Sequence, residues 1–337
     1  MNGKLYQSVL AMLILLTLLA TACGPPPTPA PAPRDTLPQF TPAGLAFDRD
    51  GNLWAASNEG AWRLDPTSGM CIHFTEENGL AEDYLSAIAV GPDGDVWFGG
   101  WRNGDISRFD GRRWTTYTKY DGSADEGNAV LGIAVAPDGD LWFAVAYYAY
   151  HFDGKTWTSY TANDSLPDLG VNAIAAAPDG TIWFGGNEFG DAPGGIARFD
   201  GESWAAYTSD DGLADNDITD IAVAPDGAVW VGAWHGVSRF DGETWITFTE
   251  EDGLAGSWVG DIAVGLDDAI WFATSKGVSR FDGENWTTYV ESDGLLNNNV
   301  RALAVAPDGK IWAGMAGGVS CFNGERWVTH KVGRDIP

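Results

Sequence analysis

The sequence predicts an all-β fold, a seven-bladed β-propeller of four-stranded antiparallel blades. An element that reads IAVAPDG and then WFGG, or a close variant, recurs along the chain, and a period near 40 residues indicates stacked supersecondary units. Each copy also holds four short runs rich in β-branched and aromatic residues, as strands do. The element's tryptophan recurs seven times, at intervals of 41 to 47 residues: Trp54, Trp97, Trp142, Trp183, Trp230, Trp271 and Trp312.

The copy at residues 220–253 shows how one blade is built. Its runs DIAVA and AVWVGA are joined by Pro225-Asp226-Gly227, and GVSRF and WITFT are joined by Asp241-Gly242. Asp-Gly supplies the positive φ angles that tight hairpins need, so the four runs form a meander. The first predicted strand belongs to blade one and the last to blade seven. Packing between blade faces must therefore close the ring, helped by residues 35–40.

The N-terminal residues predict export and a lipid anchor. Lys4 precedes an apolar run at residues 9–19, which is the layout of a secretory signal and falls short of the roughly 20 residues of a membrane span. The small residues before Cys23 resemble the lipobox of bacterial lipoproteins, which implies lipidation of Cys23. The alternative is an ordinary cleaved signal. We predict a lipoprotein signal peptide at 1–22, a proline-rich linker at 23–40 and the propeller at 41–333.

The composition limits the partners. The chain has 47 acidic and 19 basic residues and a formal net charge of −28, whereas nucleic-acid backbones are bound by clustered Lys and Arg. We therefore expect no nucleic acid as partner, membrane contact through the lipid anchor only, and a monomer. The expected location is the cell envelope, on the extracytoplasmic side.

Residues 211–242 read DGLADNDITDIAVAPDGAVWVGAWHGVSRFDG. This segment resembles the two-component regulator propeller repeat in its DGL, PDG and GVSRFDG pieces, and the resemblance extends over residues 41–332. It implies an extracytoplasmic sensor or scaffold. Residues 91–98, GPDGDVWF, are similar to the virginiamycin B lyase propellers. That second resemblance implies a competing function, in which histidines and a glutamate near the central channel open a cyclic depsipeptide.

The histidines give this lyase hypothesis little support. His151 occupies the repeating arginine position of strand three, His73 and His330 fall on strand four, and only His235 lies in a loop between strands two and three. A lyase of this kind needs two histidines and a carboxylate that converge, so we predict no catalytic residue. No cofactor or zinc motif is present. The PDG and FDG aspartates could hold calcium, but turn chemistry alone requires them, so no metal is predicted.

Other aromatic and basic residues recur at fixed repeat positions, which favours a structural role over a ligand site. We expect the tryptophans to form the core between blades and the arginines to pair with carboxylates of the repeat. The tryptophans of strand four are Trp114, Trp157, Trp204, Trp245, Trp286 and Trp327. The arginines of strand three are Arg63, Arg108, Arg198, Arg239 and Arg280.

Residues that break the repeat predict the binding face. Because consecutive strands are antiparallel, the loops between strands two and three emerge with the linkers between blades, opposite the PDG and FDG turns. An aromatic crescent over blades two to five suits a ligand or partner protein; the alternative is that these rings only cap the blade edges. The candidate binding residues are Trp101, Arg102, Asn103, Tyr147, Tyr148, Glu188, Phe189, Trp234 and His235.

Cys71 and Cys321 depart from the repeat on the two blades that must meet to close the ring. A disulfide between them would close a loop of about 250 residues, which the chain-entropy model values at about 4 to 5 kcal/mol; two unrelated buried thiols are the alternative. The sequence thus favours an exported propeller that binds a ligand or protein, as sensor or scaffold. A streptogramin B lyase-like carbon–oxygen lyase and a purely structural envelope protein are the alternative functions.

Overall fold

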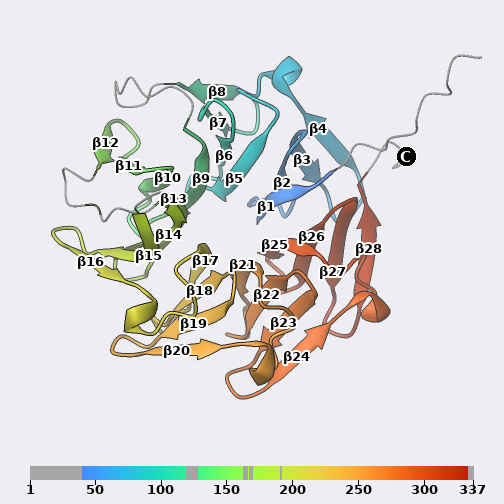
Figure 1. The fold of residues 1–337 in the computed structure, drawn as a ribbon. Coiled ribbons are helices and arrows are strands. Elements are labelled where there is room, and N and C mark those ends of the chain that lie inside the picture. Colours follow the sequence, from blue (N-terminus) through green and yellow to red (C-terminus); the bar gives the residue numbers. More distant parts are fainter. Residues whose placement is uncertain (1–39, 119–127, 162–165, 167–169, 190–191, 333–337) are drawn as a thin grey trace, which may run out of the picture. The chain divides into compact units, whose positions relative to one another are not determined.

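Seven four-stranded antiparallel sheets form a ring in the computed structural model, which confirms the predicted propeller (Figure 1). The structure describes residues 40–118, 128–161, 166, 170–189 and 192–332. The chain divides into two units, Met1–Leu37 and Pro38–Pro337, and the ring belongs to the second. Cys23 and the predicted signal peptide lie outside the described residues. Within the described ranges, no helix has the length and apolar character to cross a membrane.

Every sheet consists of four consecutive strands, of which the first is innermost and contacts the first strand of each neighbouring blade. Blades 1 and 2 contain β1 (Pro42–Phe47), β2 (Leu53–Ser57), β3 (Gly60–Leu64), β4 (Cys71–Phe74), β5 (Leu85–Val90), β6 (Val96–Gly100), β7 (Ile106–Phe109) and β8 (Trp114–Tyr117). Blades 3 and 4 contain β9 (Val130–Val135), β10 (Leu141–Val145), β11 (Tyr148–Phe152), β12 (Trp157–Tyr160), β13 (Gly170–Ala176), β14 (Ile182–Phe189), β15 (Ala192–Phe199) and β16 (Trp204–Tyr207).

The remaining three blades follow the same order. They contain β17 (Ile218–Val223), β18 (Val229–Ala233), β19 (Gly236–Phe240), β20 (Trp245–Phe248), β21 (Val259–Val264), β22 (Ile270–Thr274), β23 (Gly277–Phe281), β24 (Trp286–Tyr289), β25 (Val300–Val305), β26 (Ile311–Met315), β27 (Gly318–Phe322) and β28 (Trp327–Lys331). Short 3-10 turns follow the fourth strand of several blades: η1 (Glu76–Asn78), η3 (Ser209–Asp211), η4 (Glu250–Asp252) and η5 (Glu291–Asp293).

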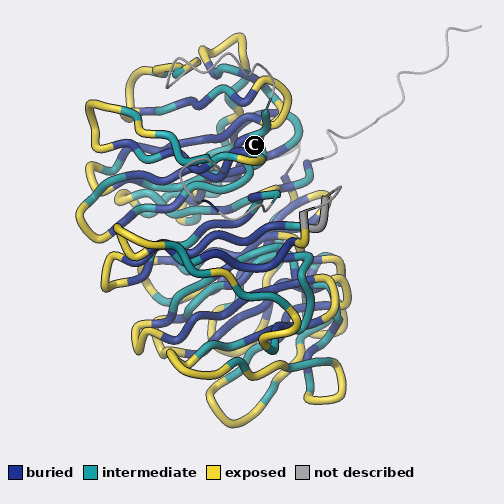
Figure 2. The backbone as a smooth tube through the Cα atoms, turned by 60° about the vertical axis from the view of Figure 1, so that its left-hand side comes forward, coloured by how far each residue is buried: buried dark blue, intermediate teal, exposed yellow. Residues whose placement is uncertain are grey.

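The core is divided among the interfaces between blades. Seven clusters of buried side chains occur in the described part of the chain, and each joins two neighbouring blades. Trp230 of β18 is typical, because its ring stacks on Phe248 of its own blade at 5.7 Å and meets Phe272 of blade 6 edge-on at 5.6 Å. Figure 2 shows the result, with buried strands between exposed connections. The tryptophan therefore recurs because every interface needs the same aromatic filling.

The DGL motif forms the linker between blades. In the linker from blade 5 to blade 6, Gly253 ends η4 with φ 118°, and a Cβ there would come within 2.7 Å of Trp286 Cβ. Leu254 is then buried in the core cluster between these blades. The next residue, Ala255, donates its backbone N–H to Oγ of Ser279 at 2.8 Å. This explains the buried serine of the GVSRF motif, which anchors the linker.

No described blade combines both ends of the chain, as predicted, and face packing closes the ring. β1 contacts β25 in the same way that other innermost strands contact their neighbours. Phe40 contributes to the closing cluster, since its side chain is buried there and its carbonyl accepts the N–H of Gly317 at 2.8 Å. The expectation that residues just before β1 help closure is confirmed for Phe40.

Candidate functional site

We call the face with the PDG and DG turns the turn face, and the face with the strand two–three loops and the linkers the loop face. On the turn face, the aspartates cap their own turns. Asp153 Oδ1, for example, accepts the backbone N–H of Lys155 at 2.8 Å and of Thr156 at 2.7 Å. These bonds and one from the Thr156 hydroxyl lower the pKa of Asp153 to about 2. In the described ranges, no group of three or more His, Cys, Asp or Glu is placed to hold a metal ion.

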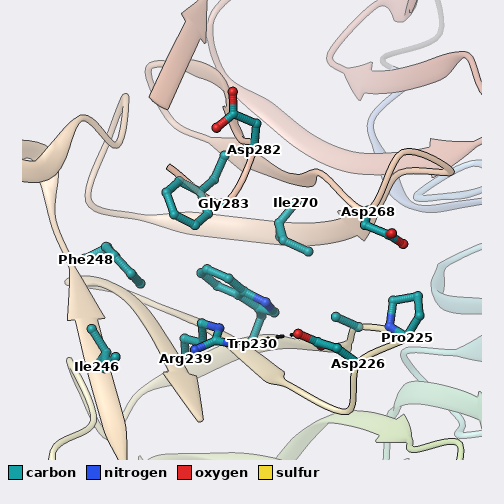
Figure 3. Close-up of a pocket in the computed structure, with 12 residues that line it drawn as sticks. Pro225, Asp226, Trp230, Arg239, Ile246, Phe248, Asp268, Ile270, Asp282 and Gly283 are labelled. Atoms are coloured by element: carbon teal, nitrogen blue, oxygen red, sulfur yellow. Dashed lines mark ion pairs between the residues drawn. The ribbon is translucent and has the colours of Figure 1, made fainter. Parts of the chain in front are cut away.

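The turn face also has cavities between blades. The one between blades 5 and 6 has a volume of about 690 Å³, and Figure 3 shows Arg239 beside Trp230 on its wall, paired with Asp226 at 3.8 Å. Similar cavities lie between blades 3 and 4, 4 and 5, and 6 and 7. Residues at the same positions of the repeat line each of these cavities, so we attribute the cavities to the repeating architecture and not to a ligand site.

Ion pairs with carboxylates, as the recurrence predicts, are formed by three of the five strand-three arginines, Arg108, Arg239 and Arg280. Arg108 pairs with Asp93 at 3.0 Å and also with Asp95, and Arg280 pairs with Asp267 at 2.8 Å. The sequence did not indicate their second contact, a cation–π interaction with strand-two tryptophan at 5.4 to 5.9 Å. It occurs for Arg63, Arg108, Arg198, Arg239 and Arg280.

The loop face carries the exposed aromatic side chains. Backbone hydrogen bonds join strand two–three loops to the linkers, as from Trp101 N–H to Tyr84 O at 2.8 Å and from Trp234 N–H to Asp217 O at 3.2 Å. Among the described residues, the large aromatic side chains with the greatest exposure all lie here: Tyr84 (37%), Trp101 (50%), Tyr147 (42%) and Trp234 (53%). The exposed large side chains elsewhere are aliphatic, as in Ile246 and Leu266.

The blade 2 loop is held in place by a residue that the sequence did not single out. Glu82 is buried in the linker, and its two carboxylate oxygens accept the N–H groups of Arg102 and Asn103, each at 2.8 Å. The guanidinium of Arg102 lies over the Tyr84 ring at 5.3 Å, and the Tyr84 and Trp101 rings are 6.2 Å apart. The signal for Tyr84 was an aromatic residue at the position held by Asp217 and Asn299 in the linkers before blades 5 and 7.

Blades 3 and 4 place their candidate residues differently. Tyr147 is exposed at the tip of the β10–β11 hairpin, whereas Tyr148 is half-buried against the core between blades 2 and 3. In blade 4, β14 and β15 each have eight residues and form a longer hairpin. The backbone of Glu188 pairs with Pro193 and that of Phe189 with Ala192; their side chains lie outside the described part of the structure.

In blade 5, His235 is the exposed neighbour of Trp234, and its Nδ1 contacts the carboxylate of Asp215. The other histidines contribute to packing. His151 takes the place of an arginine and contacts Asp140 at 2.6 Å, and the His73 ring stacks on Trp62 at 3.9 Å. His330 stacks on Trp312 at 5.1 Å, where burial lowers its pKa. His235 is therefore the histidine that a strand two–three loop itself carries, whereas His73 is exposed on β4 and contacts the Glu59 carbonyl of the blade 1 loop.

Two carboxyl groups on the innermost strands were also missed. Asp220 of β17 accepts the N–H of Ile262 at 2.7 Å, and Asp261 of β21 accepts the N–H of Leu303 at 2.7 Å. The two side chains also hydrogen-bond each other. Burial, with the charge of Asp261, raises the pKa of Asp220 well above its usual value, and burial raises that of Asp261 to about 6. Through these hydrogen bonds the two side chains link blades 5, 6 and 7.

Cys71 and Cys321 both belong to or pack against the core cluster between blades 7 and 1, and this structure has them as unbonded thiols. Burial raises the pKa of each thiol to about 11. A disulfide between them stays a prediction.

The fold and its recurring side chains define a class, a β-propeller whose loop face carries exposed aromatic rings. The family model described as "Two component regulator propeller" matches residues 165–188, 212–235 and 294–317, which lie in blades 4, 5 and 7 and the linkers before them. Three segments of this β-propeller are thus similar to the two-component regulator propeller repeat. No curated protein sequence matches it.

Solved structures share the fold at low sequence identity. A streptogramin B lyase has a TM-score of 0.69 at 18% identity, over 88% of this chain and 95% of that one. Virginiamycin B lyase from Staphylococcus aureus has a TM-score of 0.65 at 17% identity, over 82% and 92%. The WD40 propeller domain of Doa1 has a TM-score of 0.64 at 14% identity, over 86% and 94%. Since lyases and a WD40 domain have this fold, the fold does not decide the function.

Proposed function

We propose that this chain is an exported, lipid-anchored propeller that binds a ligand or a partner protein on its loop face, as a sensor or scaffold module. One observation carries the proposal. The most exposed aromatic rings of the described residues, Tyr84, Trp101, Tyr147 and Trp234, all lie on this face. Exposed aromatic side chains that are held rigidly are typical anchors of binding surfaces. The buried carboxylate of Glu82 holds one of these loops by two hydrogen bonds.

The export part of the proposal is supported by the N-terminal sequence. An apolar run precedes small residues and Cys23, in the order of a lipoprotein signal. The proposal places the propeller outside the cytoplasm, on a proline-rich spacer. We expect Cys23→Ala to move the protein from the membrane fraction to the soluble fraction. Retention of this variant in the membrane fraction would contradict lipid attachment.

The lyase alternative is weaker because three of the four histidines fill structural positions, on Trp62, beside Asp140 and on Trp312. His235 remains on the loop face with Asp215. A general base acting with a second histidine would need another imidazole near it. The binding proposal needs no such arrangement.

A ligand screen tests the binding face. Thermal-shift measurements on the full chain would compare envelope polysaccharides, peptides and cyclic depsipeptides, and each hit would be titrated against Trp101→Ala and Trp234→Ala. We expect at least one of these variants to weaken binding about tenfold, as loss of an anchor of about 1.4 kcal/mol does. Leu266→Ala, which removes an exposed side chain on the turn face, is the control. Equal affinity in both tryptophan variants would contradict the loop face as the binding site.

A further inference from the structure

We propose that the loop face binds the basic side chains of a partner protein, with Trp101 and Trp234 each stacking on a Lys or Arg of that partner beside carboxylates of this chain. The inference rests on the proposed function, since it names the kind of partner that the same face takes. Three observations support it: the surroundings of Trp101, the surroundings of Trp234, and the charge of the linkers around the ring.

At blade 2, the exposed Trp101 shares its loop with Asp105, and the buried carboxylate of Glu82 binds the backbone of the two residues that follow Trp101. Among the described residues, neither Glu82 nor Asp105 forms an ion pair, and Arg102 is directed to the Tyr84 ring instead. Asp105 lies in the same loop, where its carbonyl accepts the N–H of Gly100 at 2.9 Å. Burial and the nearby charge of Glu82 raise the pKa of Asp105. A cation bound at this loop would offset the repulsion between the two carboxylates.

The exposed ring of Trp101 gives that cation a second contact. An ammonium or guanidinium group is attracted to the face of an indole, and more so where carboxylates hold it near the ring. Because Glu82 fixes the backbone of Arg102 and Asn103, the indole is attached to a loop that is already ordered. Binding there would cost little conformational entropy.

Blade 5 also has an exposed tryptophan in a loop that is bonded to an acidic linker. Trp234 is exposed, and its backbone N–H donates to the carbonyl of Asp217 at 3.2 Å. Asp217 in turn donates its N–H to Oδ1 of Asp215 at 3.2 Å, and the other oxygen of Asp215 contacts His235. Two indoles on the same face, each beside aspartates, therefore suit a partner with basic side chains at separate points.

The linkers around the loop face are acidic as well. The four described 3-10 turns all carry acidic residues in their first turn and no basic residue in their last. These acidic residues are Glu76, Glu77, Asp210, Asp211, Glu250, Glu251, Asp252, Glu291 and Asp293. With a net charge of −28, such a surface attracts a basic protein at long range and repels an acidic one.

The test uses the full chain in a neutral detergent and a fluorescein-labelled peptide of alternating Gly and Arg. Anisotropy titrations at physiological salt would measure the affinity of wild type, Trp101→Ala, Trp234→Ala and Asp105→Asn. We expect each change to weaken binding about fivefold, the size of one cation–π or ion-pair contact at a partly desolvated site. The matched controls are Ile246→Ala, an exposed side chain on the outer strand of blade 5, and Asp138→Asn, an exposed turn-face aspartate. Both should bind as wild type does.

Three results would overturn the inference, and they separate it from the proposed function. Equal peptide affinity in all variants would show attraction by net charge without a site. Binding of labelled chitohexaose but not of the peptide, lost in Trp101→Ala, would keep the loop face and replace the basic partner by a glycan. Peptide binding that is lost in Ile246→Ala and kept in both tryptophan variants would reject the loop face itself. Thermal unfolding of every variant checks that it is folded.

Discussion

Asp220 and Asp261 illustrate at the residue scale how a small departure from the repeat creates a new property. Five blades have Gly or Ala at this position of the innermost strand, and blades 5 and 6 have Asp. The small residues leave room for the neighbouring strand, as at Gly44, where a Cβ would come within 2.9 Å of Ile88. The aspartates instead form hydrogen bonds to the neighbouring strand, to Ile262 and Leu303. In blades 5 and 6, the close packing of a small residue against the neighbouring strand is thus replaced by a hydrogen bond to a titratable carboxyl group.

We predict that this pair makes the protein less stable as pH rises. A carboxyl group whose folded pKa is raised stabilises the fold below its unfolded pKa, and that contribution is lost as pH rises through the folded pKa. For Asp261 the window runs from 3.8 to about 6, and for Asp220, whose pKa is also raised, it begins at the same value. A shift of about two units corresponds to up to about 3 kcal/mol, less where channel water screens the pair.

Thermal unfolding from pH 5 to pH 8 measures this effect. Asp220→Asn keeps an acceptor for the N–H of Ile262 and supplies a permanent N–H donor to Asp261, so its Tm should change less with pH than that of wild type. Asp138→Asn removes one carboxylate on the turn face and should follow the wild-type profile. Parallel profiles for wild type and Asp220→Asn would contradict the assignment.

At this scale, the sequence predicted the residues that repeat and, in part, those that do not. Trp101, Tyr147 and Trp234 were recognisable because they interrupt the strand two–three loops. Glu82 and the aspartate pair were not, because their partners are set by contacts between segments 20 to 42 residues apart. Such contacts depend on how blades are turned relative to one another, which the repeat does not specify.

At the element scale, the linker from strand four to the next blade is a structural unit. Its 3-10 turn, αL glycine and buried leucine recur, and the leucine enters the core between two blades. The sequence displays this unit as DGL, but only the structure shows that a serine of strand three anchors the residue that follows it, as Ser279 does for Ala255. The unit therefore couples the loop face to the core.

We predict that Leu254→Ala lowers the free energy of unfolding by about 2 to 4 kcal/mol, through lost burial and a cavity between blades 5 and 6. Leu266→Ala is a matched control, since Leu254 is 3% exposed and Leu266 is 70% exposed. The control should change stability by less than about 0.5 kcal/mol. Chemical denaturation measures both values, and equal stabilities of the two variants would contradict the role of the linker leucine.

At the scale of the whole molecule, the number of blades, their strand order and the lack of a shared blade all followed from the repeat. The interface between blades 7 and 1 is where the repeat predicts least, because both blades depart from it there. Cys71 replaces the strand-four tryptophan, so the indoles of this interface are those of Trp62 and Trp312. Cys321 replaces the strand-three arginine whose guanidinium lies over the strand-two tryptophan in five other blades. Closure depends on what the chain adds before β1.

Phe40 is that addition, and its loss should weaken the ring at one place. Its ring is buried between the two blades, meets Trp62 edge-on at 6.0 Å, and its backbone accepts the N–H of Gly317. We predict that Phe40→Ala destabilises the protein by about 3 kcal/mol through the cavity it leaves. Phe40→Leu should cost less than about 1.5 kcal/mol because it keeps most of the volume.

Hydrogen exchange distinguishes a local effect from a global one: in Phe40→Ala, amides of β1 and β25 to β28 should lose protection before those of β13 to β20. Uniform loss of protection in all blades, or a stability equal to that of wild type, would show that the face packing of β1 on β25 closes the ring without Phe40.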